Sequence, residues 1–268
     1  MLELMANLQA AQCLEPNMSG PLGESGTRWA VLMLHGFTAG PQSVLPWAET
    51  LADAGATVRV PLLAGHGTRI ADLAQTTAEQ WRRGVQRMLD AIFAEDFDKI
   101  AVAGLSMGGM LALDAARHRP VDATLVVNPA LSFKPKDQLG VFFAPLIDQI
   151  IPTVGPLAGD INKPGVTEEA YERTPVAAVH QLARLFATTR RRLDKIESPV
   201  VHYWSPRDQI VPKSSARILR RSLAPELLTT VVLEDSFHVA TLDYDAPLIY
   251  RHSIDQLLEL SGDRHETS

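Results

Sequence analysis

The sequence of 268 residues contains a single cysteine, Cys13, and has no excess of basic residues. One cysteine excludes an intramolecular disulfide framework and a zinc site built from clustered cysteines. The formal net charge is −6, and the basic stretches, such as Arg190–Arg192, are short and local. Because neutralising phosphates needs a basic face, the composition argues against nucleic acid as a partner.

Long apolar runs are also missing, and no segment reaches the ~20 residues that a membrane-spanning helix requires. The N-terminal stretch has no basic region, since its first charged residue is Glu3 and its first arginine is Arg28, so it does not read as a secretory signal peptide. We therefore expect no stable membrane insertion and a cytoplasmic location. The sequence leaves the oligomeric state open.

Apolar runs rich in β-branched residues alternate with helical patterns along most of the chain. The expected strands are Ala30–Leu34, Ala56–Val60, Ile100–Ala103, Ala123–Val127, Val200–Trp204 and Thr229–Leu233. The expected helices cover 43–54, 77–93, 107–118, 176–190, 213–221 and 247–260. Continuously apolar strands are typical of a sheet covered on both faces, so the pattern predicts an α/β fold with a doubly wound, mostly parallel sheet. Ligands of such a sheet gather at the carboxyl ends of its strands.

The alternation breaks at residues 130–174, which are rich in proline and contain no expected strand. A structureless loop of that length is improbable in a compact domain, so we predict a small inserted helical cap that overhangs the strand ends. The α/β core then comprises residues 29–129 and 175–262. Residues 1–28 are expected to form an irregular N-terminal tail, and residues 263–268 a C-terminal one.

The most informative motif is Gly104-Leu105-Ser106-Met107-Gly108-Gly109, which lies between an expected strand and an expected helix. Glycines two residues before and after Ser106 let the strand and the helix approach closely, while the serine occupies a strained turn with its hydroxyl clear of the sheet. This arrangement is typical of a nucleophilic serine. Such a serine needs a neighbouring base and donors that stabilise an oxyanion.

Two residues stand where the partners of Ser106 are required. Asp208 follows the expected strand Val200–Trp204, and His238 follows the last expected strand, so both reach the carboxyl edge of the sheet in the order serine, acid, histidine. We expect His238 to act as the base and Asp208 to orient it.

Other residues near these positions are weaker candidates. Asp235 is the main alternative acid and Glu234 a weaker one, because both lie just before the histidine rather than on the preceding strand's loop. His66, in Gly65-His66-Gly67, is a candidate to line the site, although a histidine in such a loop more often braces the loop itself.

An oxyanion hole on this fold takes one backbone N–H from the residue after the nucleophile and one from an early loop. The Met107 N–H lies at the start of a helix, where the helix dipole favours negative charge. The loop His35-Gly36-Phe37-Thr38 offers the second donor, most plausibly the Phe37 N–H, and leaves the Phe37 ring free to cover an acyl group.

From about residue 30 to residue 260, the sequence resembles α/β-hydrolases of the bacterial carboxylesterase and monoacylglycerol lipase group. The segments that carry the resemblance are His35–Thr38, Gly65–Gly67, Lys99–Gly109, Asp208 and His238–Asp243. The resemblance implies an α/β-hydrolase fold, Ser106, Asp208 and His238 as catalytic triad, Phe37 and Met107 as oxyanion donors, and ester hydrolysis without cofactor or metal. Where relatives commonly have glycine before the catalytic histidine, this chain has Phe237.

We therefore expect a serine hydrolase that cleaves small-molecule esters of short- to medium-chain acyl groups through an acyl-serine intermediate. Monoacylglycerols are among the candidate substrates. Its activity should fall on the acid side with an apparent pKa of about 6 to 7. Thioesterase, amidase or acyltransferase chemistry on the same triad, and a non-catalytic ligand-binding homologue, are the alternatives. The apolar residues of the cap either pack onto the core or line a substrate pocket. The candidate substrate-pocket residues are Phe142, Phe143, Leu146, Ile147, Phe237 and Val239.

Overall fold

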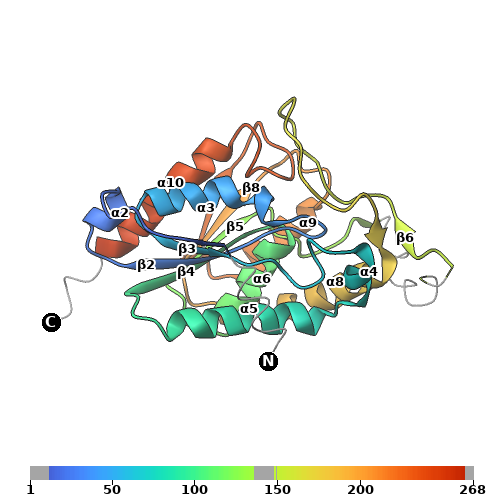
Figure 1. Cartoon of the computed structure of the whole chain (residues 1–268), viewed down its shortest axis with the longest axis horizontal. Helices are drawn as coiled ribbons and strands as arrows, with labels where there is room; N and C mark the ends of the chain where they lie inside the picture. Colours follow the sequence, from blue (N-terminus) through green and yellow to red (C-terminus); the bar gives the residue numbers. More distant parts are fainter. Residues whose placement is uncertain (1–11, 136–147, 149, 263–268) are drawn as a thin grey trace.

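Seven strands form one sheet in the order β1-β3-β2-β4-β5-β8-β9, as the computed structural model shows (Figure 1). The structure describes residues 12–135, 148 and 150–262. The strands are β1 (Gln12–Leu14), β2 (Trp29–Leu34), β3 (Thr57–Val60), β4 (Lys99–Leu105), β5 (Ala123–Val127), β8 (Val200–Trp204) and β9 (Leu228–Val232). Neighbouring strands are parallel except for β1, which pairs antiparallel with β3 at one edge. The predicted mostly parallel sheet is therefore confirmed.

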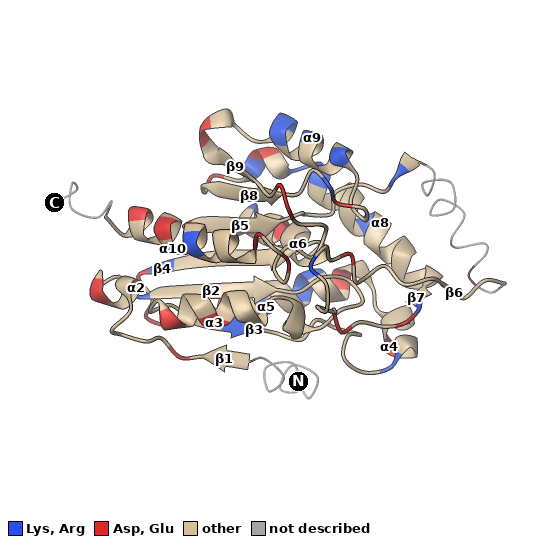
Figure 2. Ribbon diagram, turned by 90° about the horizontal axis from the view of Figure 1, so that it is seen from above, with Lys and Arg blue, Asp and Glu red and all other residues tan. Residues whose placement is uncertain are grey.

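Helices cover both faces of the sheet (Figures 1 and 2). One face carries α2 (Pro21–Glu24), α3 (Leu45–Asp53) and α10 (Ala246–Gly262), and the other carries α5 (Ala78–Phe93), α6 (Met107–Ala116), α8 (Val176–Arg190) and α9 (Lys213–Ser222). The described residues also form α4 (Ile70–Gln75) and the 3₁₀ turns η1 (Pro41–Ser43), η2 (Leu193–Lys195) and η3 (Pro225–Leu227). None of the helices in the described ranges is long and apolar enough to span a bilayer.

The inner strand β2 shows why the runs are continuously apolar. Its side chains alternate between the two faces, so Leu32 and Leu34 pack under α5 and α6 while Val31 and Met33 pack under α3 and α10. Both sets are fully buried. A strand with two buried faces favours apolar side chains at successive positions, which is the pattern that β2 displays.

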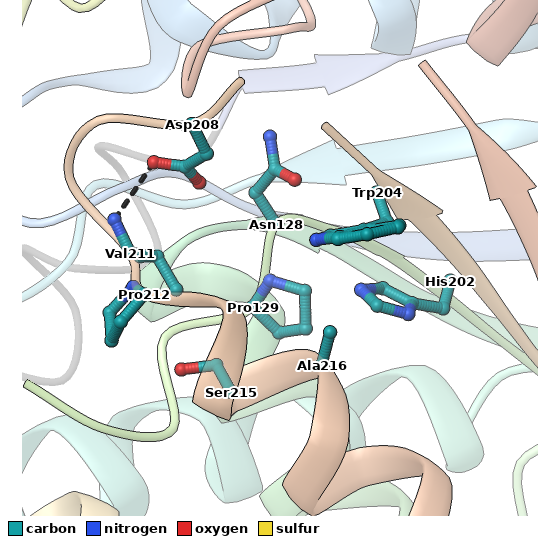
Figure 3. Close-up of a pocket in the computed structure, with 9 residues that line it drawn as sticks. All are labelled: Asn128, Pro129, His202, Trp204, Asp208, Val211, Pro212, Ser215 and Ala216. Carbon is teal, nitrogen blue, oxygen red and sulfur yellow. Dashed lines mark hydrogen bonds between the residues drawn. The ribbon is translucent and has the colours of Figure 1, made fainter. Parts of the chain in front are cut away.

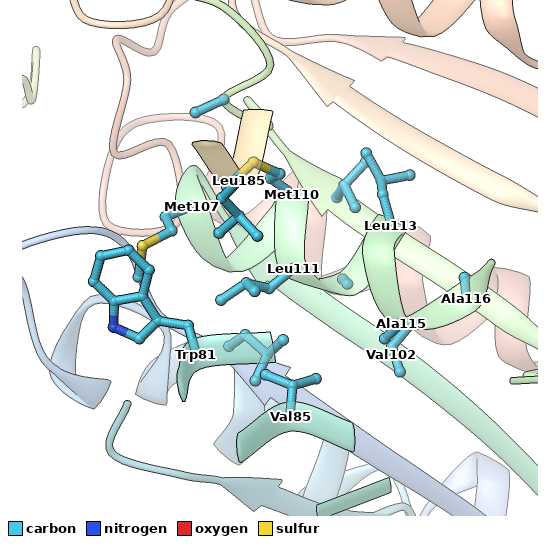
Figure 4. Close-up of a cluster of buried hydrophobic side chains, with 14 of the residues drawn as sticks. Trp81, Val85, Val102, Met107, Met110, Leu111, Leu113, Ala115, Ala116 and Leu185 are labelled. Atoms are coloured by element: carbon cyan, nitrogen blue, oxygen red, sulfur yellow. The ribbon is translucent and has the colours of Figure 1, made fainter. Parts of the chain in front are cut away.

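Helix α6 is buried along its whole length, an unusual property for a helix of a layered fold. Met107, Met110 and Leu111 pack among Trp81 of α5 and Leu185 of α8, as the hydrophobic cluster in Figure 4 shows. Packing on all sides fixes the start of α6 relative to the sheet. The backbone of the turn that leads into this helix is therefore fixed as well.

The N-terminal segment, expected to be irregular, is structured over part of its described length. Gln12–Leu14 pair with Val58–Val60 as the edge strand β1. Leu22 of α2 is fully buried, and its N–H donates to Ala54 O at 2.7 Å. The expectation failed because a three-residue edge strand and a four-residue helix are too short to leave a periodic pattern.

The described part of the cap also differs from the expectation of helices without strands. Thr153–Val154 (β6) pair antiparallel with Thr174–Pro175 (β7), which places a short ribbon at the point where the cap returns to the core. A single antiparallel bridge joins Ala170 to Ala39, beside the early loop of the core. The cap segment that precedes β7 is therefore tied directly to the loop that follows β2.

Candidate functional site

The carboxyl ends of the central strands meet at one edge of the sheet. The register pairs Leu34 with Gly104, Leu105 with Val127 and Trp204 with Val232. The residues that follow these positions are His35, Ser106, Asn128, Ser205 and Leu233. Loops from five strands therefore contribute to a single region.

Ser106 occupies the turn between β4 and α6 with φ 57° and ψ −115°. This positive φ is uncommon for a residue with a Cβ and costs about 1–3 kcal/mol. The backbone around it resists relaxation, because the Ser106 N–H donates to Val127 O at 3.0 Å and its carbonyl accepts from Ala130 N at 3.1 Å. Only 9% of the residue is exposed. Within the described chain, its Oγ makes no hydrogen bond.

The two glycines of the turn are required by close contacts between strand and helix. A Cβ on Gly108 would lie 2.1 Å from Leu34 O, and one on Gly104 would lie 2.4 Å from the Gly108 carbonyl carbon. Neither distance is tolerated by real Cβ atoms. The predicted close approach of strand and helix is therefore confirmed.

His238 and Asp208 form a buried pair at the same edge. The distance from His238 Nδ1 to Asp208 Oδ2 is 2.7 Å, and each side chain is 5% exposed. A proton on Nδ1 leaves Nε2 unprotonated and able to accept one. Burial lowers the pKa of His238, but the carboxylates of Asp208, Glu168 and Asp160 raise it by more, so the net pKa lies above its ordinary value.

Asp208 is held by the backbone of its own loop. Its Oδ1 accepts hydrogen bonds from Ile210 N and Val211 N, both at 2.8 Å, which leaves Oδ2 for His238. The competing acids, Glu234 and Asp235, are exposed, and neither carboxylate makes a hydrogen bond or an ion pair with His238 in the described structure. The geometry thus pairs the histidine with Asp208 rather than with its sequence neighbours.

The loop after β2 presents a free backbone donor. Thr38, with φ 66°, donates its N–H to His66 Nε2 at 3.1 Å. In the part of the chain that the structure describes, neither the Phe37 N–H nor the Met107 N–H has a hydrogen-bond acceptor. Gly36 adjoins the serine, since a Cβ there would lie 3.7 Å from Ser106 Cβ. The assignment of Phe37 and Met107 as oxyanion donors stays a prediction.

The Phe37 ring is not free, contrary to expectation. It packs edge-on against Trp81 and His66, with ring centroids 6.0 and 6.1 Å apart, and the residue is 7% exposed. The aromatic ring belongs to the core because the apolar surface of α5 lies directly beneath the loop. Its contribution is to fix the loop backbone.

His66 and His35 brace this loop as neutral imidazoles. His66 Nδ1 donates to Ala64 O at 3.0 Å, while His35 Nε2 accepts from Leu63 N at 3.0 Å. Burial lowers the pKa of His66 to about 4, and burial together with the charge of His66 lowers the pKa of His35 to about 3. The default role foreseen for His66 is therefore the one observed.

Asn128 was missed by the sequence reasoning, although it links three loops. Its Nδ2 donates to His238 O at 2.9 Å and to Ser205 Oγ at 3.0 Å, and its Oδ1 accepts from Ser205 N at 2.8 Å. The residue has φ 43°, which asparagine tolerates better than most residues. An asparagine before Pro129, directly after a buried strand, was the available signal.

Tyr171 of the cap was also missed. Its N–H donates to Thr38 O at 3.0 Å, and its hydroxyl donates to Gly65 O at 3.0 Å and accepts from Thr68 N at 3.1 Å. Tyr171 therefore joins the cap to two core loops, through its backbone N–H to the loop of Thr38 and through its hydroxyl to the loop of Gly65 and Thr68. No local pattern marks such a residue in the sequence.

Of the predicted pocket residues, Phe142, Phe143, Leu146 and Ile147 lie outside the described residues. Phe237 is half-buried beneath the Arg207 guanidinium, 4.9 Å from the ring centroid. Val239 is buried in the cluster shared with α3 and α10. Pocket roles for these residues remain predictions.

A small hollow beside Asp208 is lined by residues of β8, of α9, of the loop between them and of the loop after β5 (Figure 3). It contains His202, Trp204 and Ser215, but neither Ser106 nor His238. The buried His202 Nδ1 has no hydrogen-bond partner in the described structure. Asp208 and Asn128 line this hollow and bond to His238, so it lies behind the acid and the histidine, and Ser106 is not part of its wall.

The fold and the residues at this edge of the sheet define a class of protein. The sequence profile of the alpha/beta hydrolase family matches residues 31–248. The chain belongs to the alpha/beta hydrolase family. It is 37% identical over 245 residues to a thermostable monoacylglycerol lipase of Bacillus sp. (strain H-257), covering 91% of this chain and 93% of the lipase. It is 26% identical to a carboxylesterase of Bacillus subtilis (strain 168), covering 86% of this chain and 93% of the esterase.

Solved structures give the same picture. A structure from work on LipS and LipT, two metagenome-derived lipolytic enzymes, superposes with a TM-score of 0.82 at 31% identity, covering 93% of this chain and 97% of the other. A monoacylglycerol lipase of Paleococcus ferrophilus superposes with a TM-score of 0.74 at 18% identity, covering 93% and 98%, and shows the shared fold. The α/β-hydrolase resemblance predicted from the sequence is confirmed.

Proposed function

We propose that the protein is a serine hydrolase that cleaves carboxylic esters of short- to medium-chain acyl groups, monoacylglycerols among them. The observation that carries the proposal is the buried bond between His238 Nδ1 and Asp208 Oδ2 at the edge where Ser106 is held at a positive φ. The lipase and the carboxylesterase to which the chain is similar support the substrate class. The single exposed cysteine, Cys13, is compatible with work in the reducing cytoplasm.

In the proposed reaction, Ser106 Oγ attacks the ester carbonyl while His238 Nε2 takes the hydroxyl proton. The carbonyl oxygen becomes negatively charged and accepts hydrogen bonds from the Phe37 N–H and the Met107 N–H. Each such donor is worth about 3 kcal/mol in the transition state. Asp208 keeps the imidazole in the required tautomer and stabilises the imidazolium.

The intermediate then collapses. The C–O bond to the alcohol breaks as His238 returns the proton to the leaving oxygen, and an acyl group remains on Ser106. A water molecule gives a proton to the same histidine and attacks the acyl carbon. The bond from that carbon to Ser106 Oγ then breaks, His238 returns the proton to Oγ, and the acid is released. His238 accepts and returns the proton in every transfer of this cycle.

The test combines a substrate series with Ser106→Ala. Glycerol esters and p-nitrophenyl esters of increasing acyl length are assayed with the wild type, with Ser106→Ala and with Ser222→Ala, a serine at the end of α9 that serves as matched control. We expect Ser106→Ala to lose turnover and labelling by a fluorophosphonate probe, while Ser222→Ala keeps both. Turnover retained by Ser106→Ala would overturn the proposal.

A thioester and an alcohol acceptor in the same series address the related chemistries. Faster turnover of the thioester, or transfer of the acyl group to the alcohol in preference to water, would replace ester hydrolysis by a thioesterase or an acyltransferase on the same residues. Failure of the probe to label wild-type Ser106 would point to a non-catalytic binding protein.

A further inference from the structure

Asp160, in the described part of the cap, connects the loops that carry the acid and the base. Its Oδ2 accepts from His238 N at 3.1 Å and from Gln209 N at 2.9 Å, and its backbone carbonyl accepts from Val239 N at 3.1 Å. One carboxylate oxygen therefore joins the residue after Asp208 to His238 itself. Bonds from N–H groups to a carboxylate are about twice as strong as bonds between neutral groups.

The cap segment around Asp160 is itself fixed on the core. Asp243, which is 1% exposed, accepts from Asn162 N at 2.7 Å through Oδ2 and from Lys163 N at 2.9 Å through Oδ1. The same Oδ2 accepts from Phe237 N at 2.9 Å. Before Asp160, the Gly159 N–H donates to Glu168 Oε2 at 2.9 Å. Asp160 is thus held from both sides against the histidine loop.

Three carboxylates act electrostatically on His238, namely Asp208, Glu168 and Asp160. Burial lowers the pKa of the imidazole, and these charges together raise it above the ordinary value. Asp208 contacts the ring and Asp160 contacts the backbone of the same residue. Removing the Asp160 charge should therefore lower the pKa of His238.

We propose that Asp160 is a positioning residue that sets the placement of His238 relative to Asp208 and stabilises the imidazolium formed during turnover. This inference rests on the function proposed above. The cap would then help to assemble the catalytic residues in addition to covering them.

Two substitutions separate the hydrogen bonds of Asp160 from its charge. Asp160→Asn keeps an acceptor oxygen for both N–H groups and removes the charge. Asp160→Ala removes both the acceptor and the charge. Asp122→Ala is the matched control, because Asp122 also accepts a backbone N–H, from Ile100 at 2.8 Å, at the amino end of β4, opposite the site.

We expect Asp160→Ala to lower kcat on a short p-nitrophenyl ester by at least about 10-fold with little change in KM, since a misplacement of about 1 Å can cost about 100-fold. Asp160→Asn should restore most of kcat, and the acid limb of its kcat/KM profile should lie at lower pH than that of the wild type. Asp122→Ala should change neither kcat nor the profile. Thermal unfolding of all three checks that they are folded.

The proposal is overturned if the acid limb of Asp160→Asn coincides with that of the wild type, or if asparagine restores no more of kcat than alanine does. If Asp160→Ala does not fold, the pH profile of Asp160→Asn decides. Ser106→Ala is assayed alongside. Turnover by Ser106→Ala defeats the proposed function as a whole, whereas an inactive Ser106→Ala with an unmoved Asp160→Asn profile defeats only the role of Asp160.

Discussion

The Thr38 N–H donates to the His66 Nε2 at 3.1 Å, and this bond decides which backbone donor of the early loop is left over. With Thr38 committed, Phe37 N–H is the donor that faces no acceptor in the described structure. Thr38 also has a positive φ of 66°, which is strained for a residue with a Cβ. Without the bond to His66, we expect the loop to move to a less strained conformation. A histidine outside the proposed triad thus shapes the proposed oxyanion site.

His66→Ala is therefore expected to lower kcat by about 10- to 100-fold, because the Phe37 N–H loses its fixed direction. The KM for a short ester should change much less. Steady-state kinetics on p-nitrophenyl esters give both values, with His180→Ala on α8 as control. A wild-type kcat in His66→Ala would show that the loop keeps its conformation without the imidazole.

The acid limb of activity should lie above pH 6.5, the ordinary pKa of histidine, because neighbouring carboxylates outweigh burial and raise the pKa of His238. The base must be neutral, so activity is lost as the pH falls through this raised value. Asp208→Asn should move the limb to lower pH and reduce kcat by several orders of magnitude. Profiles of kcat/KM between pH 5 and 9 test this, and a limb below pH 6 in the wild type would contradict it.

Two glycine substitutions should change stability in opposite directions. Gly108→Ala places a Cβ 2.1 Å from Leu34 O, which forces the helix away from the strand and should lower the free energy of unfolding by about 3 kcal/mol or more. Gly84→Ala, inside α5, meets no atom within 4 Å and should raise it by about 1 kcal/mol. Urea unfolding curves measure both. Equal effects of the two substitutions on the free energy of unfolding would show that the turn at Gly108 tolerates a side chain.

Acid should destabilise the fold through its buried histidines. Burial lowers the pKa of His202 to about 3, assisted by Arg220, and holds His35 and His66 at about 3 and 4. Unfolding at pH 5 should therefore take up about three protons at these histidines, so stability falls as the pH drops below about 6.5. His238, whose folded pKa is raised, contributes the opposite sign, with stability that is lost as the pH rises through that pKa.

His202→Phe isolates one of these contributions. The His202 side chain has an unpaired buried Nδ1, so a phenyl ring of similar size removes a titrating group without breaking a bond at that atom. The melting temperature of the variant should match or exceed that of the wild type at pH 8 and fall less on going to pH 5. Parallel melting curves for the two proteins across this range would rule out His202 as a source of acid sensitivity.

The sequence by itself determined the six parallel strands, the six long helices around them and the candidate residues Ser106, Asp208 and His238. Each of these is recorded in local pattern: two-face burial makes strands continuously apolar, a tight strand-to-helix turn demands glycine, and parallel strands bring the residues after them to one edge. The family resemblance followed from the same segments.

Only the tertiary structure decided what holds these residues in place. Asn128 bonds to a residue 110 positions away, and Asp160 to one 78 positions away. Side-chain bonds to distant backbone groups have no periodicity and no fixed spacing, so the chain reveals them only when folded. The packing of the Phe37 ring and the pairing of β1 were settled in the same way, by surfaces that remote segments provide.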